Sequence, residues 1–412
     1  MRLFPPLVAA ALASACGPSA SSPPPSILLI SIDTLRADHV GLYGYARDTT
    51  PFLDRFAAQG LVFEHAFSSA PWTLPAHMTM LTGLFPAQHG VVGENLALAP
   101  GIPLLAERLR AAGYQTLGLY YPCWIGARHG FERGFDVFRE HHSVEEARAH
   151  VAEELARRDP AKPTFTFLHL FDVHDGPLPT GEHMLYASPP PYQDFFMPGA
   201  ADKLPRVAPE VLWESTNGLD EEQRAALVAL YDGGIRHVDA NLELLFAQLE
   251  RDGDLAHTLV IVTADHGESL GQRGRLDGHG ELAQEGLHVP LVVRAPDGAR
   301  AGTRVSTPVH LGDIVPTVLA VAGLPADERL PGSSLLGPLP EQRVIAGTYL
   351  PNEFVVRWPE KLVRRRGVGC GSDEGLRRAL GKRAVPRGID PSNAIGDRRV
   401  RREHRAQPRG RA

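Results

Sequence analysis

The chain has 412 residues, of which 43% are hydrophobic and 22% are charged, and its formal net charge is −6. This balance excludes a chain that is disordered throughout and is typical of a soluble globular protein with material for one large core or two. The charge is uneven, because residues 361–412 contain 16 Lys and Arg against 5 Asp and Glu. The body of the chain is therefore acidic and its end is basic.

Residues 1–16 have the features of an export signal. Arg2 supplies a positive charge, an apolar run follows, and small residues precede Cys16. The run is too short to span a bilayer. Residues 12–16 also resemble a bacterial lipoprotein signal, in which Cys16 would be acylated, and simple cleavage is the alternative. The Pro- and Ser-rich residues 17–26 would then form a tether. We expect an exported protein, periplasmic or anchored as a lipoprotein to a membrane of the bacterial cell envelope.

Five apolar runs predict strands that are buried on both faces, as in the middle of a parallel sheet. They cover residues 26–32, 115–120, 164–170, 258–263 and 289–293. Helical patterns lie between them, at residues 51–59, 104–112, 144–157, 221–249 and 311–322. This alternation predicts an α/β fold, with a central, mostly parallel sheet sandwiched by helices in a catalytic domain of residues 27–340. In such sheets, ligands bind beyond the carboxyl ends of the strands.

The later part of the chain is less regular. Residues 175–218 are rich in Pro and predict a long loop over the site. Strand-like pieces at 343–348 and 353–358 predict the start of a small C-terminal subdomain, complete or truncated, at residues 341–363. Residues 364–412 predict a basic, disordered tail, or the product of a frameshift in GC-rich coding sequence. Because no aromatic residue is interleaved with the basic ones and the body is acidic, we expect no nucleic-acid partner.

Metal-binding side chains follow two of the predicted strands. Asp33 comes after residues 26–32, and Asp265 and His266 come after residues 258–263. Two carboxylates and an imidazole at one sheet edge suit a divalent cation, which on this ligand set is calcium, manganese or zinc. An Asp after a strand can instead cap the next helix, and for either Asp alone that alternative is the stronger one.

Residues 71–83 predict a turn followed by a helix, with Thr73 at the N-cap and Pro75 in the first turn. The unpaired N–H groups and the helix dipole would hold an anionic phosphate or sulfate at that end. A metal on the hydroxyl would also favour an alkoxide nucleophile. Taken alone, Thr73 is better explained as a plain helix cap.

A set of short motifs resembles the sulfatase family of the alkaline phosphatase superfamily. The motifs occur in the family's order and span residues 27–336, so the resemblance implies the family's α/β sandwich. They are DTLRAD at 33–38, GLYGY at 41–45, TLPAHMTMLTG at 73–83, GFERGFD at 130–136, TADHGE at 263–268, EGLHVPL at 285–291, DIVPT at 313–317 and PGSSLL at 331–336.

The resemblance implies roles for particular residues. The matching positions are the metal ligands Asp33, Thr73, Asp265 and His266, the nucleophile Thr73, and His174, whose counterpart in the family assists the leaving group. Thr34 stands where many sulfatases have a second metal-binding Asp. A hydrogen-bonded loop residue is the alternative interpretation of His174.

Thr73 departs from the family pattern. Sulfatases carry Cys or Ser there and oxidise it to formylglycine, whereas the secondary alcohol of Thr would give a ketone. We therefore expect Thr73 to attack phosphorus as an alkoxide and to release the covalent phospho-enzyme to water. Phosphoethanolamine transferases of the same superfamily use a metal-bound Thr with an Asp-His pair in this way. That set is similar to Asp33, Thr73, Asp265 and His266.

Two positions that bear cations in sulfatases carry histidine here. His77 replaces an Arg, and His279 replaces a Lys. We expect both to hold the remaining oxygens of the transferred group, and so to join Thr73 and His174 as catalytic residues. An imidazole is charged only when its pKa or the pH allows. The site would therefore be slow, or tuned to a less charged substrate such as a diester.

These residues predict a metal-dependent hydrolase of sulfate or phosphate esters, with phosphate esters preferred because no formylglycine can form. The substrate would be a small molecule, a glycan or a lipid. One alternative is a transferase that passes a phosphoethanolamine-type headgroup to an envelope glycan or lipid. The other is a catalytically impaired binding protein, which the missing Arg and Lys favour and the retained site residues oppose.

Overall fold

The computed structural model describes residues 24–174, 176–177, 183–184, 186–204, 219–272, 282–341, 343–349 and 352–364. Cys16 and the rest of the expected export signal lie outside these residues, as do His279 and the tail after Arg364. Within the described part of the chain, no helix is both long enough and apolar enough to cross a membrane.

The core is an eight-stranded sheet in the order β12-β2-β11-β9-β1-β6-β4-β5. β1 (Ser26–Ile32) lies between β9 (Thr258–Ala264) and β6 (Thr164–Leu170) and pairs with both in parallel. Every residue of β6 and β9 is buried. Apart from the serines of β1 and His169 of β6, the residues of these strands are apolar or β-branched, because both faces of the strands are covered.

The flanking strands continue the sheet on both sides. On one side, β4 (Gln115–Tyr120) and β5 (Val137–Glu140) run parallel to β6. On the other side lie β11 (Leu291–Arg294), β2 (Leu61–Phe63) and β12 (Thr303–Val305). β11 is antiparallel to β9 and to β2, so the sheet is mostly parallel, as predicted.

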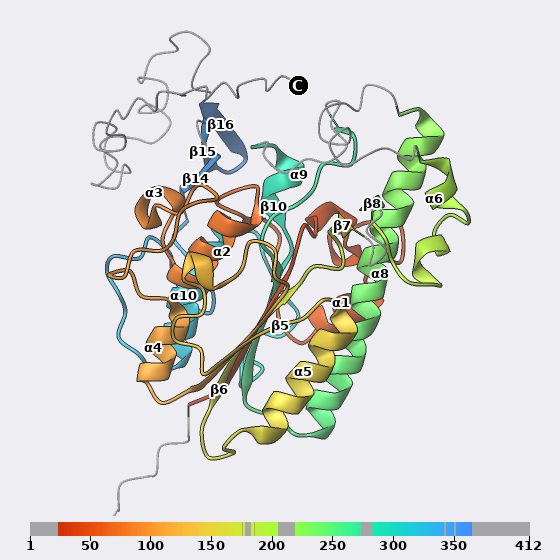
Figure 1. The fold of residues 1–412 in the computed structure, drawn as a ribbon. Helices are drawn as coiled ribbons and strands as arrows, with labels where there is room; N and C mark the ends of the chain where they lie inside the picture. The colour runs from red at the N-terminus through yellow and green to blue at the C-terminus, as the bar shows by residue number, and fades with distance from the viewer. Residues whose placement is uncertain are drawn as a thin grey trace, which may run out of the picture.

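Helices cover both faces of the sheet (Figure 1). One layer consists of α1 (Pro51–Ala57), α5 (Val144–Arg157) and α8 (Glu221–Arg251). The other consists of α2 (Thr73–Thr82), α4 (Leu105–Ala111) and α10 (Ile314–Val321). The short helices are α3 (Pro86–His89), α6 (Ala200–Lys203) and α9 (Gln284–Leu287). This arrangement confirms the predicted α/β sandwich.

The expected bounds of β1, β4, β6 and α5 agree with the structure, and two other predictions need correction. The expected strand 289–293 is interrupted at Pro290, which has no N–H to donate. It divides into β10 (His288–Val289) and β11, and β10 joins β3 (Ala66–Phe67) and β13 (Val309–His310) in a separate small sheet. The helix expected from residue 311 begins at Ile314, after a 3-10 turn at Leu311–Asp313.

The irregular segment 175–218 is described only in parts. These parts include β7 (Gly176–Pro177), β8 (His183–Met184) and α6, and α6 packs against α8. The described portion of the segment is therefore not all loop.

The end of the described chain forms a small antiparallel sheet of β14 (Ile345–Tyr349), β15 (Asn352–Arg357) and β16 (Glu360–Arg364). The sequence did not predict β16, because its charged residues resemble those of the tail that follows. Ile345, Phe354 and Val356 pack with Phe67 and Leu287 in a second apolar cluster. The sheet therefore docks beside the strands of the small β10-β3-β13 sheet.

A buried ion pair also ties this sheet to the main domain. Arg343, just before β14, donates from both terminal nitrogens to the carboxylate of Asp313, at 2.7 and 2.6 Å. Asp313 also accepts from the backbone N–H of His310 and of Ser333. Burial opposes ionisation of Asp313, but His310 and Arg343 outweigh it and hold the pKa of Asp313 below its usual value.

Replacing Arg343 by methionine is expected to lower the free energy of unfolding by about 3 kcal/mol at pH 7, because it leaves the Asp313 carboxylate buried without its partner. A carboxyl whose folded-state pKa is lowered stabilises the protein above its unfolded pKa and loses that contribution as the pH falls. The difference between Arg343→Met and the wild type should therefore shrink below about pH 4.

Urea unfolding at several pH values measures this difference. Arg329→Met is the control, because Arg329 pairs with Asp327 at an exposed position. An equal loss in both variants would contradict a special role for the Arg343–Asp313 pair.

Candidate active site

Two neighbouring strands deliver the two aspartates to the same place. The last residues of β1 and β9, Ile32 and Ala264, are paired in register. Asp33 directly follows β1 and Asp265 directly follows β9. Both residues therefore lie side by side at the carboxyl ends of the strands. Both carboxylates are completely buried.

Hydrogen bonds orient Asp265 and His266 toward one point. Asp265 Oδ1 accepts from the backbone N–H of His266 at 2.8 Å and of Thr34 at 3.3 Å, while Oδ2 has no hydrogen-bond partner. His266 Nδ1 lies 2.8 Å from the carbonyl oxygen of Gly267, which can only accept, so Nδ1 carries the proton. The lone pair of His266 Nε2 therefore faces the carboxylates, as in a metal-ligating histidine.

Asp33 completes the cluster. Its Oδ2 accepts from His169 Nε2 at 3.0 Å and from the Thr73 hydroxyl at 3.4 Å, and its Oδ1 has no hydrogen-bond partner. His266 Nε2 lies 3.6 Å from Asp33 Oδ1 and 3.4 Å from Asp265 Oδ2. The three donor atoms lie within 4.8 Å of one another. Two buried carboxylate oxygens without hydrogen bonds, next to an imidazole lone pair, fit a divalent cation.

The ionisation of the two carboxyls reflects their shared burial. Burial and the negative charge of Asp33 raise the pKa of Asp265 well above its usual value. Burial opposes ionisation of Asp33 too, but the hydrogen bond from His169 and the electrostatic influence of His174 and His266 hold its pKa far below the usual value. Without a cation, the cluster therefore favours ionisation of Asp33 and disfavours ionisation of Asp265. A bound divalent cation would compensate the negative charge of both carboxylates.

Thr73 lies at the start of α2 and faces this cluster. Its hydroxyl oxygen is 3.3 Å from His266 Nε2 and 3.4 Å from Asp33 Oδ2. The predicted N-cap role is wrong: the extended residue Trp72 is the N-cap, and Thr73 is the first helical residue. The Thr73 hydroxyl lies against Asp33 and His266, and the N-cap residue Trp72 makes no side-chain cap hydrogen bond.

His77 lies one turn further along α2 and is completely buried. Its Nδ1 donates to the carbonyl oxygen of Thr73 at 2.9 Å, so its Nε2 accepts from the Ser31 hydroxyl at 3.0 Å when the ring is neutral. Burial, together with the neighbouring His169, lowers the pKa of His77 well below its usual value. His77 Nδ1 also lies 3.4 Å from Asp265 Oδ2. Because both ring nitrogens are engaged by Thr73 and Ser31, neither is left for the expected contact with an oxygen of the transferred group.

His169 is a site residue that the sequence analysis missed. It lies on β6, paired in register with Ser31 of β1, and its Nε2 donates to Asp33. Its ring also meets that of His77 edge to face, with centroids 4.8 Å apart. The available signal was a histidine next to the last residue of an otherwise apolar strand. This signal does not by itself indicate a site residue, because side chains at buried strand positions ordinarily serve core packing.

His174 lies beyond the carboxyl end of β6. Its ring stacks on Phe171 at 4.3 Å, and Phe171 stacks on Tyr121 at 4.2 Å. His174 also acts electrostatically to lower the pKa of Asp33 and of Asp265. The structure thus brings Thr73 and His77 to the Asp33, Asp265 and His266 cluster and places His174 beyond the end of β6, whereas His279 lies outside the described residues.

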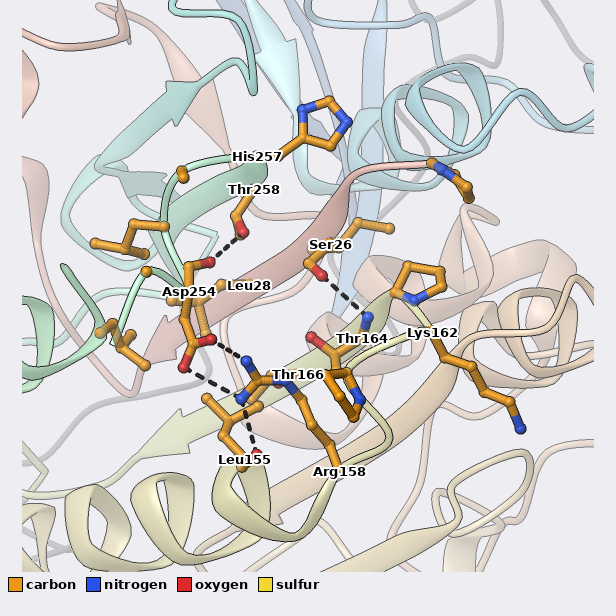
Figure 2. A pocket seen from close by; sticks show the side chains of 18 of the residues that line it. Ser26, Leu28, Leu155, Arg158, Lys162, Thr164, Thr166, Asp254, His257 and Thr258 are labelled. Atoms are coloured by element: carbon orange, nitrogen blue, oxygen red, sulfur yellow. Dashed lines mark hydrogen bonds and ion pairs between the residues drawn. The ribbon is translucent and has the colours of Figure 1, made fainter. Parts of the chain in front are cut away.

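A cavity of about 220 Å³ lies at the other edge of the sheet. Figure 2 shows it around the first residues of β1, β6 and β9, with Arg158 bonded to Asp254 and to the carbonyl oxygen of Leu155. Ligands of α/β sheets bind beyond the carboxyl ends of the strands, whereas this cavity adjoins the amino ends. We therefore assign it no part in the chemistry of the site.

Comparisons with known proteins agree with this geometry. The model of the sulfatase family matches residues 25–324, so the chain belongs to the sulfatase family. N-acetylgalactosamine-6-sulfatase of Homo sapiens is 27% identical over 368 residues, which are 80% of this chain and 68% of that protein. Members of this family hydrolyse ester bonds, and the chain is accordingly a sulfatase-family hydrolase.

Solved structures share the fold. The phosphonate monoester hydrolase of Agrobacterium radiobacter superposes with a TM-score of 0.65 at 21% identity, over 82% of this chain and 87% of that one. A protein solved with its substrate D-glucosamine-2-N,6-O-disulfate has a TM-score of 0.63 at 18% identity, over 86% of this chain and 92% of that one. At these identities the likeness concerns the fold alone.

Proposed function

We propose that this protein is a metal-dependent hydrolase of phosphate-type esters, with Thr73 as the nucleophile. The observation that carries the proposal is the position of the Thr73 hydroxyl, within 3.4 Å of both Asp33 and His266. A threonine at this point cannot supply the aldehyde hydrate that sulfatases use, and an alkoxide reacts readily at phosphorus.

The start of α2 supports attack by Thr73. The N–H groups of the first helical turn point toward the end where Thr73 lies, and the helix dipole adds positive potential there. Both would favour an anionic phosphoryl group next to the hydroxyl. A divalent cation bound by Asp33, Asp265 and His266 would polarise the phosphoryl oxygen and lower the pKa of the Thr73 hydroxyl.

The ligand set favours zinc or manganese over calcium. Calcium takes six to eight oxygen ligands, whereas this compact cluster offers an imidazole nitrogen and one oxygen from each of two carboxylates. Imidazole nitrogen mixed with carboxylate oxygen suits zinc and manganese. Thr34 adds no side-chain ligand, because its hydroxyl donates to the carbonyl oxygen of Asp33 at 2.8 Å.

The remaining residues would serve proton transfer and orientation. His174 would protonate the departing ester oxygen as Thr73 attacks, and would then take a proton from the water that hydrolyses the phosphothreonine. Its stacking on Phe171 restricts the orientation of its ring. His77 would hold the start of α2 through the Thr73 carbonyl, and His279 would contact an oxygen of the transferred group.

Aromatic side chains beside the nucleophile support a substrate that contains an aryl or sugar ring. Trp72 precedes Thr73, is half-buried, and meets Trp124 edge to face with centroids 5.6 Å apart. Rings of this kind pack against aryl groups and against the apolar faces of sugars. The proposed substrate is therefore an aryl or glycosyl ester of phosphate or phosphonate.

Turnover of a panel of 4-nitrophenyl esters tests the proposal. The panel contains a phosphate monoester, a phosphate diester, a phosphonate monoester and a sulfate, each with zinc, manganese or calcium added to chelator-treated protein. We expect turnover of a phosphate or phosphonate ester with zinc or manganese, and the least with the sulfate. Faster turnover of the sulfate than of every phosphorus ester would overturn the proposed preference.

A further inference from the structure

The residue after Asp33 has an unusual backbone conformation. Thr34 has a φ of 56°, in the left-handed region. β-branched residues rarely adopt this region, because the branched Cβ crowds the backbone. Such a conformation persists only where the surrounding structure holds it, and it is found disproportionately at functional sites.

The side chain of Tyr231 holds this turn from α8. Its hydroxyl donates to the carbonyl oxygen of Thr34 at 2.8 Å and accepts from the backbone N–H of Arg36 at 3.0 Å. Tyr231 is completely buried, so both backbone groups depend on this hydroxyl in the absence of solvent. The two hydrogen bonds therefore join Tyr231 to the residues immediately before and after Leu35.

The conformation of Thr34 matters because its N–H reaches a metal ligand on another strand. It donates to Asp265 Oδ1 at 3.3 Å, the same oxygen that accepts from the backbone N–H of His266. With Oδ1 engaged by both donors, Oδ2 is left to face Asp33 and His266. Thr34 therefore links the two ligand-bearing strands, and its orientation is set by Tyr231.

The next residue of α8 anchors the rest of the same loop. Asp232 is buried and accepts from the Tyr45 hydroxyl and from Arg47, both at 2.7 Å, and lies 2.7 Å from His39 Nδ1. The His39 ring also meets the Tyr231 ring edge to face, with centroids 5.1 Å apart. Two adjacent residues of α8, Tyr231 and Asp232, thus hold the loop after β1. Of the two, only Tyr231 contacts the backbone next to Asp33.

We propose that Tyr231 is a positioning residue of the metal centre, whose hydroxyl holds Thr34 in its left-handed conformation and thereby aims the Asp265 carboxylate at the cation. The inference rests on the metal site of the proposed function. It assigns to Tyr231 no contact with substrate or metal. Outer partners that orient metal ligands commonly contribute 10- to 100-fold to affinity.

Metal affinity of Tyr231→Phe tests the inference. Calorimetric titration of chelator-treated protein with zinc and with manganese should show binding weakened by about 10- to 100-fold relative to the wild type. Tyr114→Phe is the matched control. Tyr114 is also buried, and its hydroxyl donates to the carbonyl oxygen of Pro25 at 3.0 Å, next to the opposite end of β1. This variant should lose similar stability and bind the metal as the wild type does.

A second variant separates positioning from a general loss of packing. Glycine adopts positive φ without the penalty of a branched side chain. Adding Thr34→Gly to Tyr231→Phe should therefore restore part of the metal affinity. Hydrogen exchange should show faster exchange of the Arg36 amide in Tyr231→Phe, because that N–H loses its acceptor, and not in Tyr114→Phe.

The outcomes are distinguishable. If the wild type binds zinc or manganese and Tyr231→Phe binds equally well, the inference fails and the proposed function stands. If both Tyr variants weaken binding equally, or if Thr34→Gly restores none of the lost affinity, the effect is one of stability and the positioning role is overturned. If the wild type binds neither cation, the proposed metal centre fails and the inference fails with it.

Discussion

Replacing Thr73 by alanine is expected to reduce turnover of the best phosphorus ester by at least about 10,000-fold, because it removes the attacking atom. Thr73→Ser should keep activity within about 100-fold of the wild type, since it retains a hydroxyl at the start of α2. We expect both effects because the hydroxyl of Thr73 is the group that lies against Asp33 and His266.

Two controls show whether the loss belongs to the hydroxyl. Thr82→Val removes a hydroxyl from the far end of the same helix, where Thr82 bonds back to Met78, and should keep turnover. Rapid quenching of the wild type and mass spectrometry should detect a phosphoryl group on Thr73 and none in Thr73→Ala. Turnover in Thr73→Ala close to that of the wild type would rule out a covalent intermediate on this residue.

Replacing Asp265 by asparagine is expected to have the second large effect. It should weaken metal binding and raise the stability of the metal-free protein. The side chain of the Asp265→Asn variant would keep an oxygen for the N–H groups of Thr34 and His266, but it would face Asp33 with an amide nitrogen in place of a carboxylate oxygen. We expect at least about 100-fold weaker zinc or manganese binding, since a charged ligand is lost.

The metal-free Asp265→Asn protein should instead unfold at a higher temperature than the metal-free wild type. In the wild type, burial and the charge of Asp33 disfavour ionised Asp265, and the neutral amide removes that penalty. Thermal unfolding with chelator and with added zinc measures both effects. Asp254→Asn, in the ion pair with Arg158 at the opposite sheet edge, is the control and should leave metal affinity unchanged.

If Asp265→Asn bound zinc as tightly as the wild type, Asp265 would not be a ligand, whatever the change in stability. If its metal-free form were less stable than the metal-free wild type, the argument that two buried carboxylates repel each other would be wrong. The two readouts therefore test the ligand role and the electrostatic cost separately.

The meeting of Asp33, Asp265 and His266 at one sheet edge could be predicted because their positions depend on local order. Each of Asp33 and Asp265 follows a continuous apolar run, and parallel strands end at the same edge of a sheet, so two such residues meet without further information. The motifs around them added the sulfatase resemblance, which the family match confirms. The metal-binding and catalytic roles that the resemblance implies stay predictions, and the variants above test those of Thr73 and Asp265.

Other features depended on contacts between distant segments. The Thr73 hydroxyl lies against Asp33 and His266, which follow β1 and β9, and not against the backbone N–H groups that it was expected to cap. His169 gained its role from its register opposite Ser31, and Tyr231 from the packing of α8 against the loop after β1. Local composition and periodicity do not determine which distant residues are paired in this way.

The sequence by itself therefore determined the alternation of strands and helices, the α/β class and the placement of carboxylates at strand ends, because periodicity and burial act over a few residues. The tertiary structure alone decided which histidines approach Asp33, which way the Thr73 hydroxyl points, and how Thr34 is held in its left-handed conformation. Those choices result from hydrogen bonds between residues up to 231 positions apart, whose energies arise only when the sheet and its helices have assembled.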